Sequence, residues 1–225
     1  IAPARVRPED FLAVIEIEKG SKNKYEMDKE TGALRLDRIL YTSTHYPANY
    51  GFIPRTWADD GDPLDVLVLC SECIRPLSLV ECYPIGVIIM DDSGSQDEKI
   101  IAIPFDDPTY NGYRDIKELP SHIFDEMQHF FSVYKQLERG KQTEVKDIGG
   151  PMAAVAVMEK AMENYRSHGV DLFWLDEAEP EYTAQDFDLY RYYDGPALEC
   201  ANEYPVRYSQ TFFDGMKTVS YTHLR

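Results

Sequence analysis

Four aspartates stand within the seven residues Asp59–Asp65, which read Asp-Asp-Gly-Asp-Pro-Leu-Asp. The glycine and proline predict a turn, and the apolar run Val66–Leu69 that follows is typical of a strand. A turn anchored in this way lets Asp60, Asp62 and Asp65 converge, and like charges that converge raise one another's pKa. A divalent cation relieves this repulsion, and hard carboxylate oxygens select Mg2+, Mn2+ or Ca2+. The alternative is a solvated acidic turn.

A second acidic segment, Asp91–Lys99, again follows an apolar run, Ile85–Met90. It places Asp92 and Asp97 on what we expect to be a Gly/Ser loop. Two acidic loops at strand ends would line one rim of a barrel. Basic and phenolic side chains occur elsewhere in the chain, at Lys24, Arg38, Lys99, Tyr134 and Lys135. Because Lys and Arg are the usual phosphate ligands, such a set suits a polyanion bridged by metal ions.

The elements that must position these residues are mostly short strands. Alternating and apolar runs predict strands at residues 11–17, 24–28, 34–39, 64–69, 79–82, 85–90 and 99–104, with a turn at Glu30–Gly32 and a loop at Tyr46–Gly51. Strands spaced this closely predict a small barrel. Helical periodicity runs from Ser121 to Gly140 and from Pro151 to His168, with Gly169 as the expected C-cap.

Composition limits the class of partner. The chain has 225 residues and a formal net charge of -17, from 40 acidic and 23 basic side chains. This charge disfavours nucleic acid as the main partner, because phosphate backbones attract basic surfaces. A small phosphorylated substrate stays compatible, since metal ions reverse the local field. No run approaches the roughly 20 apolar residues of a membrane span, and no signal-peptide core begins the chain. We therefore expect a cytoplasmic location and no membrane partner.

The cysteines and the C-terminal segment are two further features. Cys70 and Cys73 form a CxxC pair, and we favour ordinary thiols over a zinc or redox site because no second pair or nearby histidine completes a ligand set. We expect one domain over residues 1–168 and an extension of unknown role over residues 169–225. The extension holds 11 acidic, 4 basic and 12 aromatic side chains, and this aromatic density argues against plain disorder.

Several motifs together carry a resemblance to a known family. Asp60–Val66 resembles the signature of the soluble family I inorganic pyrophosphatases. Further matching motifs are Val14–Ile17, Lys24–Glu26, Asp37–Arg38, Tyr46–Gly51, Asp92–Lys99, His129–Phe131, Tyr134–Lys135 and Gly140–Lys141. The matches run in order, with family-like spacing, over about residues 10–168. One such motif is weak, whereas the ordered set argues against a merely solvated turn.

The resemblance implies an α+β fold with a mainly β core, built as an OB-like five-stranded barrel with flanking C-terminal helices. It implies a hydrolase acting on a phosphoric anhydride, which converts inorganic pyrophosphate into two orthophosphates with Mg2+ by in-line attack of a metal-bridged water or hydroxide. Mn2+ would substitute, and Ca2+ would inhibit because it is larger and holds a looser geometry. The short core resembles family members that form homohexamers, whereas eukaryotic relatives are dimers, so a homo-oligomer is expected.

The resemblance also assigns roles to matching residues of this sequence. The implied metal ligands are Asp60, Asp65 and Asp97 for the first activating metal, Asp92 and Asp97 for the metal that arrives with substrate, and Glu16 and Glu26 directly or through water. Asp62 would orient and deprotonate the attacking water. The implied phosphate ligands are Lys24, Arg38, Lys99, Tyr134 and Lys135, with Tyr50 supporting the site by hydrogen bonding. The residues expected to act in catalysis are Asp62, Arg38, Lys24, Tyr134 and Lys135.

This division of labour agrees with the chemistry of the residue types. Phosphoryl transfer needs in-line positioning and charge neutralisation more than covalent help. Two metal ions lower the pKa of bound water from 15.7 towards about 7. Lys and Arg then stabilise the charge that develops on the phosphoryl oxygens.

Structural alternatives stay open for individual residues. Glu16 could be a paired structural charge, and Lys24 with Glu26 a plain cross-strand ion pair. Tyr50 could serve core packing alone, and Tyr134 lies on the apolar stripe of its predicted helix. The neighbours interpreted without a functional role are His45 and His129 as structural, Asp59 and Asp91 as solvated, and Lys141 as peripheral.

Two other classes of function also stay open. A non-catalytic OB-type module could use the acidic loops for Ca2+, although a pure Ca2+ site does not require the Lys, Arg and Tyr set. An OB-type module for nucleic acid would normally be basic. A regulatory or scaffold variant would have kept the site and added the extension.

Overall fold

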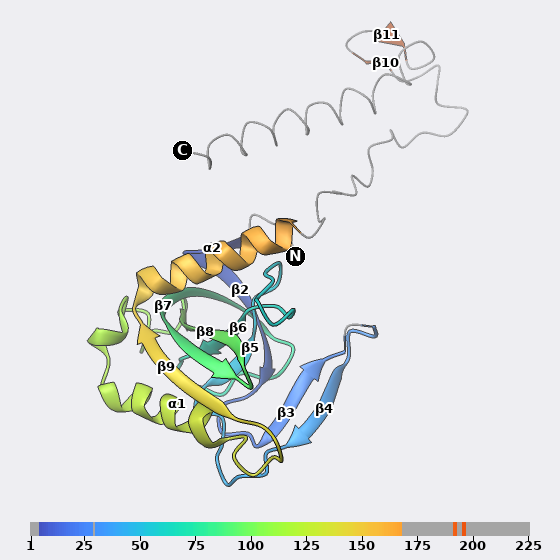
Figure 1. The fold of residues 1–225 in the computed structure, drawn as a ribbon. Helices are drawn as coiled ribbons and strands as arrows, with labels where there is room; N and C mark the ends of the chain where they lie inside the picture. Colours follow the sequence, from blue (N-terminus) through green and yellow to red (C-terminus); the bar gives the residue numbers. More distant parts are fainter. Residues whose placement is uncertain (1–4, 29, 168–190, 193–194, 197–225) are drawn as a thin grey trace. The chain divides into compact units, whose positions relative to one another are not determined.

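A computed structural model describes residues 5–28, 30–167, 191–192 and 195–196 of the chain (Figure 1). The chain divides into two units, Ile1–Val170 and Asp171–Arg225. In the second unit the description is limited to the short antiparallel pair of β10 (Arg191–Tyr192) and β11 (Gly195–Pro196). The rest of the expected extension, and the expected C-cap Gly169, lie outside the described residues.

Five strands of the first unit close into a ring. In ring order they are β2 (Asp10–Ile17), β5 (Asn49–Phe52), β6 (Asp65–Val68), β8 (Ser95–Pro104) and β7 (Leu79–Asp92). Pairing of β2 with β7 completes the ring, β6 and β8 run parallel, and the other neighbours run antiparallel. Closure removes exposed sheet edges. β1 (Val6–Arg7) extends β2, and β9 (Thr143–Gly149) extends β7.

Two helices cover the ring strands on different sides (Figure 1). Successive strand residues point to opposite faces, so Leu67 belongs to the buried cluster that includes α1 (Ser121–Val133), whereas Val66 belongs to the cluster that includes α2 (Pro151–Ser167). The buried positions of α2, at Ala154, Met158, Ala161 and Met162, follow the helical period. A short 3-10 helix, Ile116–Glu118, precedes α1.

This architecture confirms the predicted fold class: a mainly β core with a closed ring of five strands and helices that follow it. Both predicted helices exist, and α2 matches its predicted start. Within the described residues, no helix is long and apolar enough to cross a membrane.

A separate hairpin of β3 (Asn23–Met27) and β4 (Leu34–Ile39) projects beside the ring (Figure 1). Its register places Lys24 opposite Arg38 and Glu26 opposite Arg35. Gly32 takes a φ of 69° in the turn, a conformation that favours glycine. The hairpin confirms both predicted strands and brings two of the predicted phosphate ligands together.

The predicted loop at Tyr46–Gly51 is partly wrong, because Asn49–Phe52 form the central strand β5. The segment contains proline, asparagine and glycine, which are typical of turns, so the sequence does not indicate a strand. Its backbone partners lie on β2 and β6, far along the chain. Gly51 fits because a Cβ there would lie only 1.8 Å from the carbonyl oxygen of Val14, so the close approach of β2 requires a glycine.

Three other predicted boundaries are also wrong. The strands predicted at 79–82 and 85–90 form one strand, β7, with a register irregularity between Pro84 and Gly86. The predicted Gly/Ser loop is a tight turn at Ser93 and Gly94, whose φ angles are 57° and 95°, so the aspartates flanking it stand on paired strands. α1 ends at Val133 instead of Gly140, and Leu137 is 63% exposed in the turns that follow.

Candidate active site

Three side chains from three ring strands, Tyr50, Asp65 and Asp97, surround the ammonium of Lys99. Its Nζ lies 2.6 Å from Asp65 Oδ2 and 2.9 Å from Asp97 Oδ1, and only 3% of the Lys99 side chain is exposed. Tyr50 on β5 donates a hydrogen bond to the same oxygen of Asp65. The parallel pairing of β6 with β8 sets Asp65 opposite Lys99. We call Tyr50, Asp65, Asp97 and Lys99 the Lys99 cluster.

Opposing electrostatic effects act within the Lys99 cluster. Burial lowers the pKa of the Lys99 amine, but the charges of Asp65 and Asp97 outweigh it and hold the pKa well above its ordinary value. Burial raises the pKa of Asp97; Lys99 opposes the rise, and repulsion from Asp65 adds to it. Lys99 therefore offsets part of the unfavourable effect of burial on ionised Asp97.

The acidic loop, residues 53–64, joins β5 to β6 and carries further aspartates. The backbone N–H of Asp62 donates to Asp60 Oδ1 over 3.0 Å. Burial raises the pKa of Asp60 against that backbone interaction, and the charges of Asp97, Asp65 and Asp62 raise it further. The acidic loop leads directly into β6, which begins at Asp65, and Asp60 feels the charges of Asp65 and Asp97 of the Lys99 cluster.

Glu16 connects the ring to the hairpin. It is 8% exposed on β2, and its Oε1 accepts a hydrogen bond of 2.6 Å from the backbone N–H of Met27 on β3. Burial raises the pKa of Glu16 to about 7, opposed by the Met27 bond and aided by the charges of Asp65 and Glu26. Glu16 therefore lies within electrostatic reach of both the Lys99 cluster and the hairpin.

Asp92, at the end of β7, forms an ion pair with Lys135 in the turns after α1. Burial disfavours ionised Asp92, but the bond and charge of Lys135 outweigh it and lower the pKa. Burial lowers the pKa of Lys135 despite this pairing. The adjacent Tyr134 is 4% exposed and stacks on Phe130. Burial raises the pKa of Tyr134, so its phenol stays neutral.

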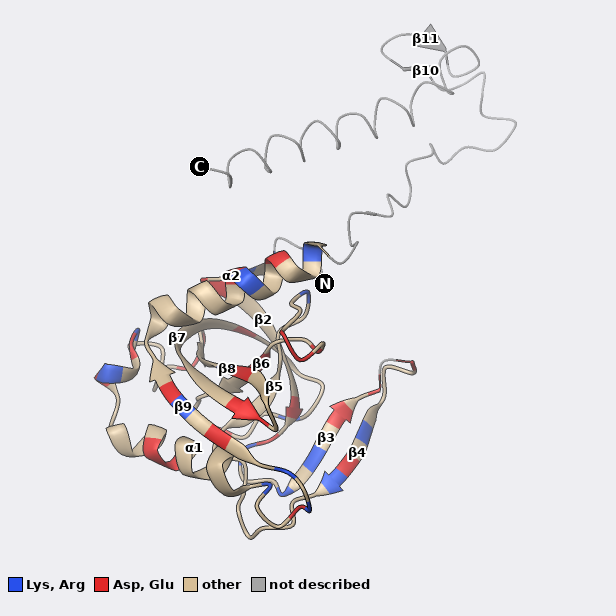
Figure 2. Ribbon diagram, viewed as in Figure 1, with Lys and Arg blue, Asp and Glu red and all other residues tan. Residues whose placement is uncertain are grey.

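The hairpin carries a second charged group, which Figure 2 shows as alternating blue and red on β3 and β4. Lys24 pairs with Glu26 and lies 3.3 Å from Asp37 Oδ2. Arg38 Nη1 lies 2.6 Å from the same oxygen of Asp37. We call Lys24, Glu26, Asp37 and Arg38 the hairpin group.

Glu138 belongs to this site, although the sequence did not single it out. Its Oε1 lies 2.9 Å from Arg38 Nε, and only 8% of the Glu138 side chain is exposed. Its other oxygen lies 3.3 Å from Lys141 Nζ. Among the described residues, Arg38 Nε, Arg38 Nη2 and Glu138 Oε1 are buried without a hydrogen-bond partner, so the contact between Arg38 and Glu138 is an ion pair that lacks hydrogen-bond geometry, and Nη2 is a free donor. The helical periodicity misplaced Glu138 on a continuing helix, and its partner Arg38 is distant along the chain.

The neighbouring aspartates and histidines differ from expectation, whereas the cysteines were expected to be ordinary thiols. Asp59 and Asp91 are not simply solvated, because they pair with Lys160 at 2.6 Å and Lys146 at 3.2 Å. His45 and His129 are exposed. Cys70, Cys73 and Cys82 are free thiols.

The donor set fits a divalent cation by chemistry. Asp60, Asp65 and Asp97 supply hard oxygen ligands, and burial together with mutual repulsion raises the pKa of Asp60 and Asp97. Across the described residues, no three His, Cys, Asp or Glu side chains already form a group that could hold a metal ion. Lys99 lies between Asp65 and Asp97 instead, and Lys135 pairs with Asp92.

A family profile described as inorganic pyrophosphatase matches residues 13–166. The chain belongs to the inorganic pyrophosphatase family. The resemblance carried by the motifs is thereby confirmed, as is the predicted enzyme class, an inorganic diphosphatase.

Individual relatives agree with the family assignment. The inorganic pyrophosphatase of Aquifex pyrophilus is 46% identical over 171 residues, which cover 75% of this chain and 97% of that protein. A solved inorganic pyrophosphatase of Helicobacter pylori is 45% identical with a TM-score of 0.69, covering 71% of this chain and 95% of that one. A solved inorganic pyrophosphatase of Coxiella burnetii is 38% identical with a TM-score of 0.70. The match covers 73% of this chain and 99% of that one.

Proposed function

We propose that this chain hydrolyses inorganic pyrophosphate to two orthophosphates in a reaction that depends on Mg2+. The observation that carries the proposal is the meeting of carboxylates from β6 and β8 at a buried lysine, beside an acidic loop whose Asp60 feels the charges of Asp65 and Asp97, in a chain of this family. A pyrophosphate site needs both cation ligands and anion ligands, and both kinds of group lie here.

The cation ligands in this proposal are carboxylates of the ring and the acidic loop. Asp60, Asp65 and Asp97 would hold one ion, and Asp92 with Asp97 another. Glu16 and Glu26 would contribute directly or through water. When bound, Mg2+ would supply charge neutralisation for the polyanion and acidify water. Burial, followed by repulsion from neighbouring carboxylates, raises the pKa of Asp60 and Asp97, and a bound cation would relieve both effects.

The anion ligands would be the basic and phenolic groups around these carboxylates, namely Lys24, Arg38, Lys99, Tyr134, Lys135 and Tyr50. Arg38 provides the clearest support, because its Nη2 is a buried donor without a partner in the described part of the chain. Buried donors are rarely left unpaired, and a phosphate oxygen would satisfy this one. Lys99 and Lys135 each hold carboxylates assigned to cations, so cation binding would free their ammonium groups for phosphate.

Asp62 is assigned the proton transfer. It stands in the acidic loop next to Asp60, and its charge reaches Asp60. In this role Asp62 accepts a proton from the attacking water and keeps that water aligned with the phosphorus. Arg38, Lys24, Tyr134 and Lys135 would stabilise charge on the phosphoryl oxygens, where positioned donors contribute most to catalysis.

A phosphate-release assay on the full chain tests the proposal. Asp62→Asn should lower turnover of pyrophosphate with Mg2+ by roughly 100-fold or more, the scale of a lost general base. Asp91→Asn is the matched control, because Asp91 pairs with Lys146 away from the Lys99 cluster, and its turnover should stay near that of the wild type. Near-normal phosphate release by Asp62→Asn would refute the role of Asp62.

The choice of metal separates this enzyme from a Ca2+-binding module. Activity should appear with Mg2+, persist with Mn2+ and fall when Ca2+ is added, since Ca2+ favours larger and looser coordination. Phosphate release that requires Ca2+, or that needs no divalent ion, would contradict the proposal.

Assembly, location and the extension belong to the same proposal. We propose that residues 1–168 form the catalytic domain, that the chain forms a homo-oligomer, a hexamer or a dimer, and that it works in the cytoplasm. Sedimentation of the full chain and of a chain ending at residue 168, with activity measured on both, tests the first two points. Loss of activity in the shortened chain would assign residues 169–225 a part in the site.

A further inference from the structure

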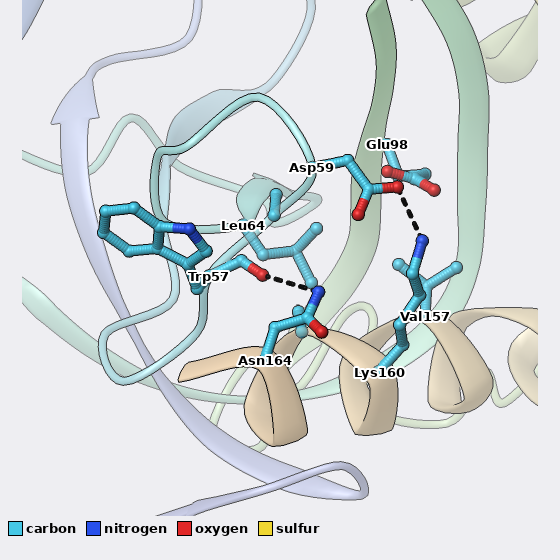
Figure 3. Close-up of a pocket in the computed structure, with 9 residues that line it drawn as sticks. Trp57, Asp59, Leu64, Glu98, Val157, Lys160 and Asn164 are labelled. Atoms are coloured by element: carbon cyan, nitrogen blue, oxygen red, sulfur yellow. Dashed lines mark hydrogen bonds and ion pairs between the residues drawn. The ribbon is translucent and has the colours of Figure 1, made fainter. Parts of the chain in front are cut away.

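Helix α2 contacts the acidic loop at three points within little more than one helical turn, and Figure 3 shows the two that involve the side chains of Lys160 and Asn164. The backbone N–H of Trp57 donates to the carbonyl of Ala161 over 2.9 Å. Asn164 Nδ2 donates to the carbonyl of Trp57 over 3.4 Å. Lys160 Nζ donates to Asp59 Oδ2 over 2.6 Å. These contacts join the helix to the residues directly before Asp60.

Hydrogen bonds within the acidic loop connect its two ends. A contact that fixes one part of the loop therefore restricts the position of the rest. The backbone N–H of Ile53 donates to the carbonyl of Leu64 over 2.9 Å, and that of Leu64 to Thr56 Oγ1 over 2.8 Å. The N–H of Ala58 donates to the carbonyl of Asp62 over 2.8 Å. Because Ala58 lies between two residues bound by α2, the position of Asp62 is coupled to the helix.

Helix α2 and the acidic loop pack closely, and the space between them is too small to be a ligand pocket. The hollow there measures about 10 Å³, room for about one water molecule. Leu64, Val157 and Ala161 line it with apolar groups. Two elements packed this closely constrain each other.

Lys160 also faces the second acidic segment. Figure 3 shows Glu98 of β8 near the Lys160 ammonium. The bond to Asp59 is the main cause of a raised pKa at Lys160, and the charge of Glu98 contributes. Glu98 is adjacent to Asp97, so a single ammonium of α2 lies between the acidic loop and the strand that carries Asp97.

We propose that α2, through Lys160 and Asn164, positions the acidic loop for cation binding, which makes Lys160 a positioning residue. The inference rests on the proposed function, since it assigns Asp60 and Asp65 to a cation. The Lys160 and Asp59 side chains are 54% and 40% exposed, and exposed pairs of this kind contribute little to the stability of the fold. Loss of Lys160 should therefore change cation affinity while the fold persists.

The direction in which Mg2+ affinity changes on loss of Lys160 distinguishes a positioning role from a purely electrostatic one. Removal of a positive charge beside carboxylates makes the local potential more negative, which would strengthen cation binding. Weaker binding after loss of Lys160 therefore requires displacement of the ligands. Lys160→Met suits this test because it keeps most of the aliphatic stem and removes the ammonium.

The experiment is a calorimetric titration of the full chain with Mg2+ in the absence of pyrophosphate. Lys160→Met should bind Mg2+ about fivefold more weakly than the wild type, the most that an exposed pair supports, and Lys160→Arg should recover most of the affinity. The matched control is Arg166→Met, which removes the same charge from α2, where Arg166 pairs with Glu163 of the same helix. It should bind Mg2+ as tightly as the wild type or more tightly.

Asn164→Ala provides a second variant without any change of charge, and we expect it to weaken Mg2+ binding about twofold. Melting temperatures of all variants establish that they are folded. Wild-type affinity in both Lys160→Met and Asn164→Ala would overturn the inference and leave the proposed function intact. A wild type that binds no Mg2+ would overturn both.

Discussion

The Lys99 cluster and the hairpin group carry the same kinds of charge but hold them in different ways. In the Lys99 cluster the Lys99 side chain is 3% exposed, and the carboxylates that it contacts, Asp65 and Asp97, come from different ring strands. In the hairpin group the side chains are 17% to 40% exposed and pair mainly along one hairpin. Ion pairs are screened far less in a buried place than near solvent. The fold therefore depends on the first set of charges more than on the second.

The difference divides the proposed site into two structural parts. The carboxylates proposed as cation ligands stand mainly on the ring and on the acidic loop that joins two of its strands. Lys24 and Arg38, which are proposed as phosphate ligands, stand on a two-stranded element outside the ring. Glu16 and Glu138 connect the two parts, through Met27 and Arg38 respectively.

The largest effect on stability is expected at the centre of the ring. Lys99→Met should lower the free energy of unfolding by about 3–5 kcal/mol, because it leaves Asp65 and Asp97 buried without their cation. Urea unfolding in EDTA measures this, and added Mg2+ should restore part of the loss. Lys146→Met, which breaks an exposed pair with Asp91, is the control and should cost about 1 kcal/mol or less. Equal losses of unfolding free energy in Lys99→Met and Lys146→Met would contradict the claim that the buried ion pairs contribute more to stability than the exposed ones.

Glu16 predicts an effect that depends on pH. Its pKa in the folded chain is about 7, above the ordinary 4.5, so the stability of the fold falls as pH rises from 4.5 to about 7, with no penalty below 4.5 and the full penalty above about 7. In EDTA, Glu16→Gln should stabilise the chain at pH 8 by up to about 3 kcal/mol and have little effect at pH 4.5. Thermal unfolding at both pH values measures this. Destabilisation by Glu16→Gln at pH 8 would show that the ionised carboxylate is favoured in the fold.

How much of the site the sequence predicts depends on whether partners are close along the chain. The spacing of Asp60, Asp62 and Asp65 is local, so the acidic loop could be recognised directly. Glu138 could not, because its partner Arg38 lies on a strand 100 residues earlier. Lys160 was missed for the same reason, since it is paired to Asp59 over 101 residues.

The same reasoning explains the strands. β3 and β4 were predicted because a hairpin pairs with itself and its alternation is visible. β5 and β9 were missed because their backbone partners lie on distant strands. β9 carries charged residues at several positions, with a mixed burial pattern, so no apolar period marks it.

Glu138 offers a test of the connection between the two parts of the proposed site. Glu138→Gln keeps the shape but removes the charge 2.9 Å from Arg38 Nε. We expect a loss of about 1–3 kcal/mol in unfolding free energy, the scale of a weakened buried interaction, and a KM for pyrophosphate that rises more than kcat falls. Arg35→Met, which loses an exposed contact with Glu26, serves as the control. An unchanged KM in Glu138→Gln would separate Glu138 from substrate binding.

The smallest effect on stability is expected in the hairpin group. Lys24→Met should cost about 1 kcal/mol or less, because its partners stay near solvent, yet it should raise the KM for pyrophosphate. Steady-state kinetics and urea unfolding on the same preparation measure both. A large loss of stability with an unchanged KM would make the hairpin group structural and reverse the comparison.

The most direct test of the central claim is the rate of phosphate release from pyrophosphate by Asp65→Asn with saturating Mg2+. Asp65 contacts Lys99 and Tyr50 and affects the pKa of Asp60, and it is one of the three ligands proposed for the first cation. We predict a fall in turnover of about 100-fold or more, with a circular dichroism spectrum like that of the wild type. Turnover within a few-fold of the wild type would contradict the assignment of this cluster as the catalytic centre.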